Sequence, residues 1–305
     1  PAEALTDSEF AAIYKEAQIA QLLTLFHHAL VTFGMTAGPS PAWGIAIMCL
    51  VLVIRICLLP LFLSQMRAMQ RIQVLEPQIQ RIQHKYAARK DPRSKEAMQR
   101  EIMALQQRYN ANPLGSCLPS LIQAPILCSL FYTLQSLPAI ADGNAEPLGG
   151  IDHTMAGDIE SSSIFGVRIA DSFGTVASPQ SRIIIGVAVA LMCLTLFAIQ
   201  WMLIHRNTSK DAMVSPQFRV QKMTVFVFPA IYVVSGATLP FGVLLYWLTN
   251  NLWNLGQTLC QLRWFPTPGS AAGERKARRD YEQDNRRRAA AGLPSLEEER
   301  AMAAR

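Results

Sequence analysis

The sequence predicts an all-α polytopic membrane protein, with five transmembrane helices around a hydrophilic groove and a cytoplasmic antiparallel helical hairpin. Half of the 305 residues are hydrophobic and only 16% are charged, well below the usual quarter. The apolar residues come in blocks about as long as a bilayer is thick, and the basic residues gather in alternate loops. A soluble bundle of buried helices is the alternative, but 305 residues are too few to bury five such blocks.

Residues 1–42 are expected to form an outer-face region. The chain begins at Pro1 rather than Met, which indicates a processed or trimmed amino terminus, and whether a signal or short anchor preceded it stays open. Over residues 10–33, apolar side chains recur at steps of three and four, with polar ones on the opposite side. This pattern is typical of an amphipathic helix lying along the membrane surface. A sixth span is the alternative, because residues 22–35 are nearly apolar.

Five apolar runs of roughly 17 to 24 residues are each long enough to cross about 30 Å of hydrocarbon as a helix. The predicted spans are residues 43–63, 114–137, 183–204, 223–239 and 240–262. The segments that connect and follow them are a cytoplasmic coiled-coil hairpin (64–113), an extracellular loop (138–182), a cytoplasmic loop (205–222) and a basic cytoplasmic tail (263–305).

The distribution of lysine and arginine predicts the orientation of these spans. Residues 64–110 hold ten basic and four acidic residues, and the segment after Leu262 holds ten more basic residues. Residues 138–181 contain one basic residue, Arg168, against six acidic ones, and residues 1–42 contain only Lys15. Since cytoplasmic loops carry the excess of positive charge, the amino terminus is expected outside and the carboxy terminus in the cytoplasm.

The first cytoplasmic loop and the tail carry patterns of their own. Apolar residues step by three and four before and after a turn at residues 91–94, which favours two short helices packed as an antiparallel coiled coil over a dimerising zipper. The tail contains the basic clusters 275–279 and 286–288. These clusters fit a tail held near anionic lipid or a dock for a polyanion such as ribosomal RNA, and the two can coexist.

Arg55 is the most informative residue, because it is the thirteenth residue of the first predicted span. An arginine at mid-helix costs about 2.5 to 3.5 kcal/mol on insertion scales. It lies eight residues before Leu63, about 12 Å along a helix, which is far for the side chain to reach water unaided. No Asp or Glu occurs in any of the five predicted spans. The sequence therefore predicts a wet cavity around Arg55.

Several amide side chains also lie in the predicted spans and need hydrogen-bond partners there. They are Gln123, Gln135, Gln200, Asn250, Asn251 and Asn254. Each amide alone fits contacts between helices equally well, but together with Arg55 they favour a hydrated groove. No His, Cys, Asp or Glu cluster has ligand spacing, and no nucleophile has an evident base nearby. We therefore expect no catalytic residue, no cofactor and no metal site.

Four segments resemble the YidC/Oxa/Alb family of membrane protein insertases. They are VIRICLLP around Arg55, EPQIQRIQHKY from Glu76, NPLGSCLPSLIQAPI from Asn112 and LPFGVLLYWLTNNLWNLGQ from Leu239. The resemblance covers about residues 43–257. The chain lacks the large outer domain of Gram-negative members, so it is similar to the shorter Gram-positive form. The segment PTPGS at residues 266–270 resembles actinobacterial members of the family, which implies a protein of the bacterial plasma membrane. A chloroplast member is the minor alternative.

The resemblance implies an insertase and chaperone whose groove receives the polar segment of a client protein and releases its apolar segment to lipid. Arg55 would be the groove charge. The implied polar contacts are Gln123, Gln200, Asn250, Tyr246 and Trp247, and the implied hydrophobic slide is Pro125, Leu127 and Leu245. The expected partners are nascent membrane proteins, the lipid bilayer and, through the hairpin and tail, the ribosome, the signal recognition particle receptor and the Sec translocon, with the chain acting as a monomer.

Three other classes of protein fit parts of the sequence. A small-solute transporter or channel would also place arginine and amides at mid-membrane, but it usually shows paired repeats with broken helices. A lipid scramblase would use the same wet groove. A structural tether would explain the hairpin but not Arg55.

Overall fold

The computed structural model describes residues 7–88, 91–109, 118–210, 212–214 and 216–303. Residues 114–117 of the predicted second span and residues 112–117 of the NPLGSCLP motif lie outside these described residues. The chain divides into two compact units. The first comprises Pro1–Ala68, Asn112–Ile199 and Met223–Leu255, and the second comprises Met69–Ala111, Gln200–Lys222 and Gly256–Arg305.

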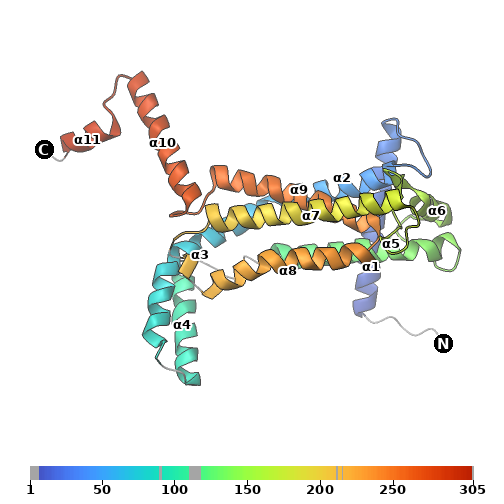
Figure 1. The fold of residues 1–305 in the computed structure, drawn as a ribbon, viewed down its shortest axis with the longest axis horizontal. Coiled ribbons are helices and arrows are strands. Elements are labelled where there is room, and N and C mark those ends of the chain that lie inside the picture. Colours follow the sequence, from blue (N-terminus) through green and yellow to red (C-terminus); the bar gives the residue numbers. More distant parts are fainter. Residues whose placement is uncertain (1–6, 89–90, 110–117, 211, 215, 304–305) are drawn as a thin grey trace. The chain divides into compact units, whose positions relative to one another are not determined.

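Helices dominate the described residues (Figure 1). The elements lying wholly or mainly in the first unit are α1 (Asp7–Thr32), α2 (Ala42–Cys57), α5 (Leu118–Ala141), α6 (His153–Ser161), β1 (Ser163–Ile164), β2 (Val167–Arg168), α7 (Pro179–Arg206), α8 (Pro216–Thr238) and α9 (Phe241–Trp264). The elements lying wholly or mainly in the second are α3 (Leu59–Tyr86), α4 (Pro92–Arg108), the 3-10 turn η2 (Ala212–Val214), α10 (Ala271–Ala290) and α11 (Leu296–Ala303).

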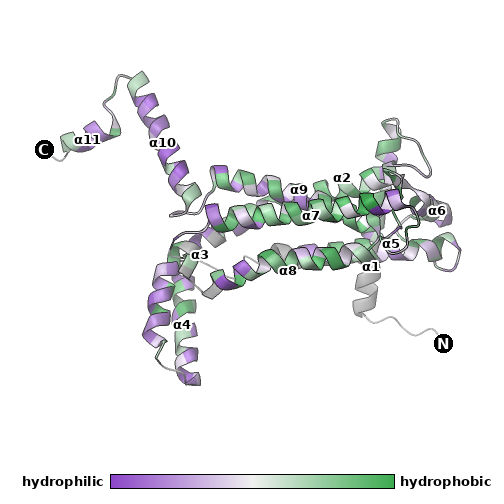
Figure 2. Cartoon of the chain, in the orientation of Figure 1, coloured by the Kyte–Doolittle hydropathy of each residue, from purple (hydrophilic) through white to green (hydrophobic). Residues whose placement is uncertain are grey.

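Three described helical segments are long and apolar enough to cross a membrane: Gln123–Ala141, Pro179–Arg206 and Phe218–Thr238. The bent pair Ala42–Cys57 and Leu59–Ile72 makes up to four if it is one span. Figure 2 shows the apolar character of α7, the mixed hydrophobic and hydrophilic residues of α4 and the mainly hydrophilic residues of α10. Although α9 has 24 residues, its amide side chains lower its mean hydropathy. The count of five spans therefore stays a prediction.

The first span differs in detail from its predicted form. We expected one helix over residues 43–63, but α2 ends at Cys57 and α3 begins at Leu59, with a bend of 52° between Ala42–Cys57 and Leu59–Ile72. Pro60 explains the break, because proline lacks an N–H and its ring clashes with the carbonyl four residues earlier. Helix α3 then continues to Tyr86, past the predicted boundary at residue 64.

The core of the first unit forms where α1, α2, α5 and α9 meet. Ile19, Leu23 and His27 lie on one buried stripe of α1, at the three- and four-residue steps of a helix face, and His27 stacks on Trp43 of α2 at a ring distance of 3.7 Å. Figure 1 shows that α1 runs across the direction of α2 and α5. This orientation suits a helix lying on a membrane surface, although the alternative of a sixth span stays open.

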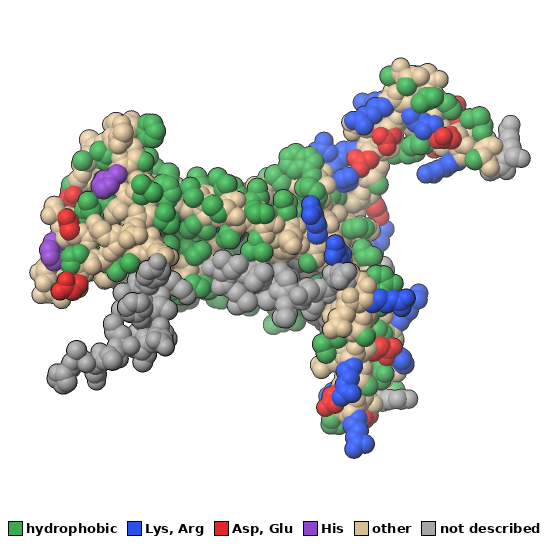
Figure 3. All heavy atoms as spheres, turned by 180° about the vertical axis from the view of Figure 1, so that it is seen from behind, with side chains coloured by type: hydrophobic (Ala, Val, Ile, Leu, Met, Phe, Trp, Pro, Cys, Tyr) green, Lys and Arg blue, Asp and Glu red, His purple; other side chains and the backbone are tan. Residues whose placement is uncertain are grey.

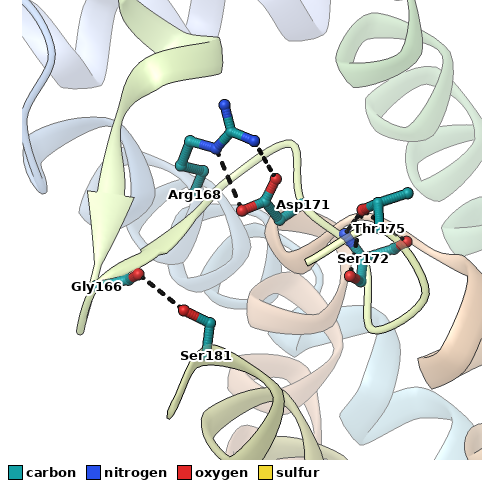
Figure 4. Close-up of polar contacts among 6 residues, drawn as sticks. All are labelled: Gly166, Arg168, Asp171, Ser172, Thr175 and Ser181. Carbon is teal, nitrogen blue, oxygen red and sulfur yellow. Dashed lines mark hydrogen bonds and ion pairs between the residues drawn. The ribbon is translucent and has the colours of Figure 1, made fainter. Parts of the chain in front are cut away.

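The segment between α5 and α7 holds the start of α9 in place. The backbone N–H groups of Phe241 and Gly242 donate to the carbonyl oxygens of Asp171 and Ile169, at 2.7 and 2.9 Å. Arg168 binds the Asp171 carboxylate through Nη2 at 2.8 Å and through Nε at 3.2 Å (Figure 4). The first two backbone N–H groups of α9 therefore have acceptors.

In the second unit, α3 and α4 pack against each other. Leu75 and Ile79 of α3 are buried in a cluster with Ile102 and Leu105 of α4. Lys85 pairs with Glu101 at 2.9 Å. These contacts are the ones a helical hairpin requires, while its description as a coiled coil stays a prediction. Figure 3 shows lysines and arginines on this hairpin and on the carboxy-terminal helices, and hydrophobic side chains over the helices of the first unit.

Candidate functional site

Arg55 of α2 points at Asn250 of α9. Its Nε donates to Asn250 Oδ1 at 2.8 Å, and its Nη2 donates to the same oxygen. Arg55 forms no ion pair within the part of the chain that the structure describes. A guanidinium carries five N–H groups, so the remaining donors of Arg55 can bind a further acceptor such as a carboxylate.

A second polar contact lies one helical turn away on α9. Gln123 of α5 donates through Nε2 to the hydroxyl oxygen of Tyr246. Tyr246 and Asn250 are four residues apart, so they share one face of the helix. The side-chain oxygen of Gln123 is buried without a hydrogen-bond partner. The structure therefore brings Arg55, Gln123, Tyr246 and Asn250 together as one polar cluster, which we call the Arg55 cluster.

The Arg55 cluster lies beside a tightly packed part of the first unit. The side chain of Tyr246 is only 1% exposed, and Asn250 and Arg55 are half-buried. Nearby on α9, Trp247 stacks on Tyr232 of α8 at a ring distance of 5.2 Å. A charge held by a neutral amide in such surroundings is not neutralised, so the cluster offers one positive charge to an anionic group that reaches it.

Tyr232 is a residue that sequence reasoning missed. Its hydroxyl donates to Asn251 Oδ1 at 3.4 Å, and its ring supports Trp247. A tyrosine within the apolar run of α8 was the available signal, but a single aromatic residue in a span is also common in plain packing.

The other predicted site residues have different surroundings. Pro125 is exposed and Leu127 is half-buried, whereas Leu245 is buried in an apolar cluster with Phe241 and Leu244. Gln200 is half-buried where α7 passes from the first unit into the second. A role for Gln200 beside Arg55, and the hydrophobic slide, therefore stay predictions.

The described residues give no sign of a metal centre. They contain no group of three His, Cys, Asp or Glu side chains that could hold a metal ion. The half-buried arginine, two amides and a buried tyrosine together offer hydrogen-bond donors, acceptors and one charge.

Residues 35–267 match the protein family described as 60Kd inner membrane protein. The "Membrane protein insertase YidC" of Bifidobacterium longum is 46% identical over 271 residues, which is 88% of this chain and 81% of that protein. The protein of the same name from Streptomyces avermitilis is 35% identical over 240 residues, which is 76% of this chain and 54% of that protein. That from Tropheryma whipplei strain Twist is 30% identical over 271 residues, which is 86% of each chain.

Proposed function

Because the chain belongs to the YidC/Oxa1 family of inner membrane proteins, which is non-enzymatic, we propose that it is a membrane protein insertase. Its relatives from three bacterial genera carry that name. The apolar helices of the chain agree with a place in a membrane. We further propose that it acts through a hydrated groove that contains the Arg55 cluster.

The groove proposal rests on the charge of Arg55 and on the kind of partner that Arg55 has. Its charge lies within an apolar helix and is held by the neutral Asn250. A structural role alone would favour a carboxylate partner, because an uncompensated charge in a membrane span is costly. Water and the acidic segment of a client protein supply the missing compensation.

In the proposed mechanism, Arg55 attracts the acidic, polar segment of a client partway across the membrane. Gln123, Asn250 and Tyr246 offer hydrogen bonds to that segment. The client's apolar segment then leaves along Pro125, Leu127 and Leu245, which requires Leu245 to become accessible, since it is buried here. The groove shortens the path of polar groups through hydrocarbon, so the step needs no bound nucleotide.

We propose that the amino terminus faces outward and the carboxy terminus faces the cytoplasm, following the distribution of basic residues. The hairpin of α3 and α4 and the tail with α10 then lie on the cytoplasmic side. There they would receive clients from a ribosome, the signal recognition particle receptor or the Sec translocon. The chain is proposed to act as a monomer.

The test is insertion of a small client with an acidic outer segment into liposomes that contain the purified protein. Wild type, Arg55→Lys and Arg55→Ala are compared at equal protein content. We expect Arg55→Lys to retain insertion and Arg55→Ala to lose about tenfold, since removing one charge contact of about 1.4 kcal/mol changes an equilibrium by that factor. Equal insertion by Arg55→Ala would refute the charge-capture mechanism, and insertion that does not depend on the protein at all would refute the insertase function.

A further inference from the structure

A cavity of about 500 Å³ lies in the second unit, lined by the ends of α7 and α9 and by the first part of α10. Five arginines line it: Arg206, Arg263, Arg275, Arg278 and Arg279. They come from three helices, and the lining includes one acidic residue, Glu282. The cavity therefore carries a large surplus of positive charge in a small volume.

Contacts between the loop after α7 and the start of α10 hold the cavity in shape. Thr267 N donates to Asn207 Oδ1 at 2.9 Å, and Ser209 pairs with Ser270 as an antiparallel bridge. Ser270 also caps α10, because its hydroxyl oxygen accepts a hydrogen bond from Gly273 N at 3.1 Å. The arginines of α10 are thus presented to those of α7 and α9 by an ordered backbone.

Several donors in the cavity lack acceptors. Among the described residues, the side chains of Arg206 and Arg263 form neither an ion pair nor a hydrogen bond. Arg279 donates through Nη2 to the carbonyl oxygen of Arg263 at 3.1 Å, but its Nε is buried without a partner. Guanidinium groups match the oxygens of phosphate in a bidentate geometry. A phosphate group would therefore satisfy donors that the described residues leave unused.

The wall of the cavity also has an apolar part, formed by Leu259 and Leu262 of α9. At the end of α9, Trp264 and Phe265 are 57% and 44% exposed, as is typical of aromatic residues at a membrane interface. Arg206 ends a helix that is long and apolar enough to cross a membrane. With α7 across a membrane, Arg206 would lie where hydrocarbon gives way to lipid head groups.

We propose that this cavity binds the phosphate-bearing head group of an anionic phospholipid, with the acyl chains leaving along Leu259 and Leu262. Basic pockets at the ends of membrane helices are a recognised way of holding such head groups. RNA fits less well, because single-stranded nucleic acid is bound by grooves with stacking aromatic side chains, whereas the described lining of this cavity holds Leu259 and Leu262 and no aromatic side chain. The inference requires that α7 spans a membrane and does not rest on insertase activity.

The test is lipid binding by the purified full chain in detergent, followed by native mass spectrometry. Phosphatidylglycerol is titrated against wild type, Arg206→Gln/Arg263→Gln and the control Arg286→Gln/Arg287→Gln. Both pairs remove two positive charges, and neither pair has a side-chain partner among the described residues, but the control pair does not line the cavity. Phosphatidylcholine with the same acyl chains, inorganic phosphate and a short single-stranded RNA are the comparison ligands.

We expect wild type to bind phosphatidylglycerol about tenfold more tightly than phosphatidylcholine, and the cavity pair to lose about tenfold while the control pair changes less than about twofold. Glu282→Gln removes the acidic residue of the lining, so it should tighten binding by about two- to fivefold. If the cavity pair and the control pair lost affinity equally, the lipid would be bound by surface charge in general, and the proposal would be overturned. Binding of inorganic phosphate at least as tight as that of phosphatidylglycerol, or cavity-dependent binding of RNA without binding of phosphatidylglycerol, would also overturn it.

Discussion

Replacing Asn250 tests whether Arg55 acts through its charge or through its place in the fold. Asn250→Asp keeps an acceptor beside Arg55 but adds a negative charge. Asn250→Leu removes the acceptor and leaves the arginine charged. The two substitutions therefore separate the hydrogen bond from the net charge of the Arg55 cluster, which a replacement of Arg55 itself cannot do.

The magnitudes follow from the separation of 2.8 Å between Arg55 Nε and Asn250 Oδ1. At that distance two opposite unit charges attract by about 1.5 kcal/mol in bulk water and about 6 kcal/mol at an effective dielectric constant of 20. The introduced carboxylate forms a direct ion pair with the guanidinium of Arg55. It should compete with the client for Arg55 and reduce capture by tenfold or more, at about 1.4 kcal/mol per factor of ten. Asn250→Leu should cost about 0.5 to 1.5 kcal/mol of stability. Because it also removes one hydrogen bond offered to the client, it should lower insertion by less than Asn250→Asp does, whatever the charge of the client.

The assay is liposome insertion of two matched clients, one with an acidic and one with a neutral outer segment. We expect Asn250→Asp to lose insertion of the acidic client and to retain insertion of the neutral one. Thermal unfolding in detergent confirms that each variant is folded. If Asn250→Asp inserted the acidic client like wild type while Asn250→Leu failed, the role of Arg55 would be structural and the charge-capture reasoning would be wrong.

Three further predictions concern stability, each measured by thermal unfolding in detergent. Gly44→Ala would place a Cβ within the side chain of Ile164 and should lower the free energy of unfolding by about 1 to 3 kcal/mol. The control Gly186→Ala, whose Cβ meets nothing within 4 Å, should be neutral or stabilising. Equal effects of the two substitutions would contradict the packing argument. Phe165 has a φ of 56° in the turn between β1 and β2, so Phe165→Asn should stabilise the protein by about 1 kcal/mol, and a loss of stability would show that the exposed ring is needed. Burial raises the pKa of the Glu76 carboxyl, so the contribution of Glu76 to stability is lost as pH rises from the ordinary carboxyl pKa through the raised value. Glu76→Gln should therefore raise the unfolding midpoint at pH 8 and leave the midpoint unchanged below pH 4. A difference in midpoint that does not vary with pH would exclude titration of Glu76.

The sequence was sufficient for properties that depend on the transfer of single segments from water to lipid. The apolar runs of α7 and α8 predict membrane helices because the free energy of transfer is summed over neighbours in the chain. Arg55 stood out for the same reason, since its cost of burial can be judged from its own helix. The family resemblance then added an expected role for Arg55, which its position alone could not supply.

Tertiary structure decided which of these residues meet. Asn250 is 195 residues from Arg55, and nothing in the local pattern distinguishes it from Asn251 or Asn254 as the partner. The break at Leu58 also differed from the expected single helix, although Pro60 was a visible signal for it. The arginine cavity could not be predicted from the sequence, because Arg206 lies far along the chain from Arg263 and the arginines of α10. The free energy of moving a segment from water to lipid depends on residues that are neighbours in the sequence, so it could be judged from the sequence. The pairing of side chains depends on how the helices pack, so only the tertiary structure could decide it.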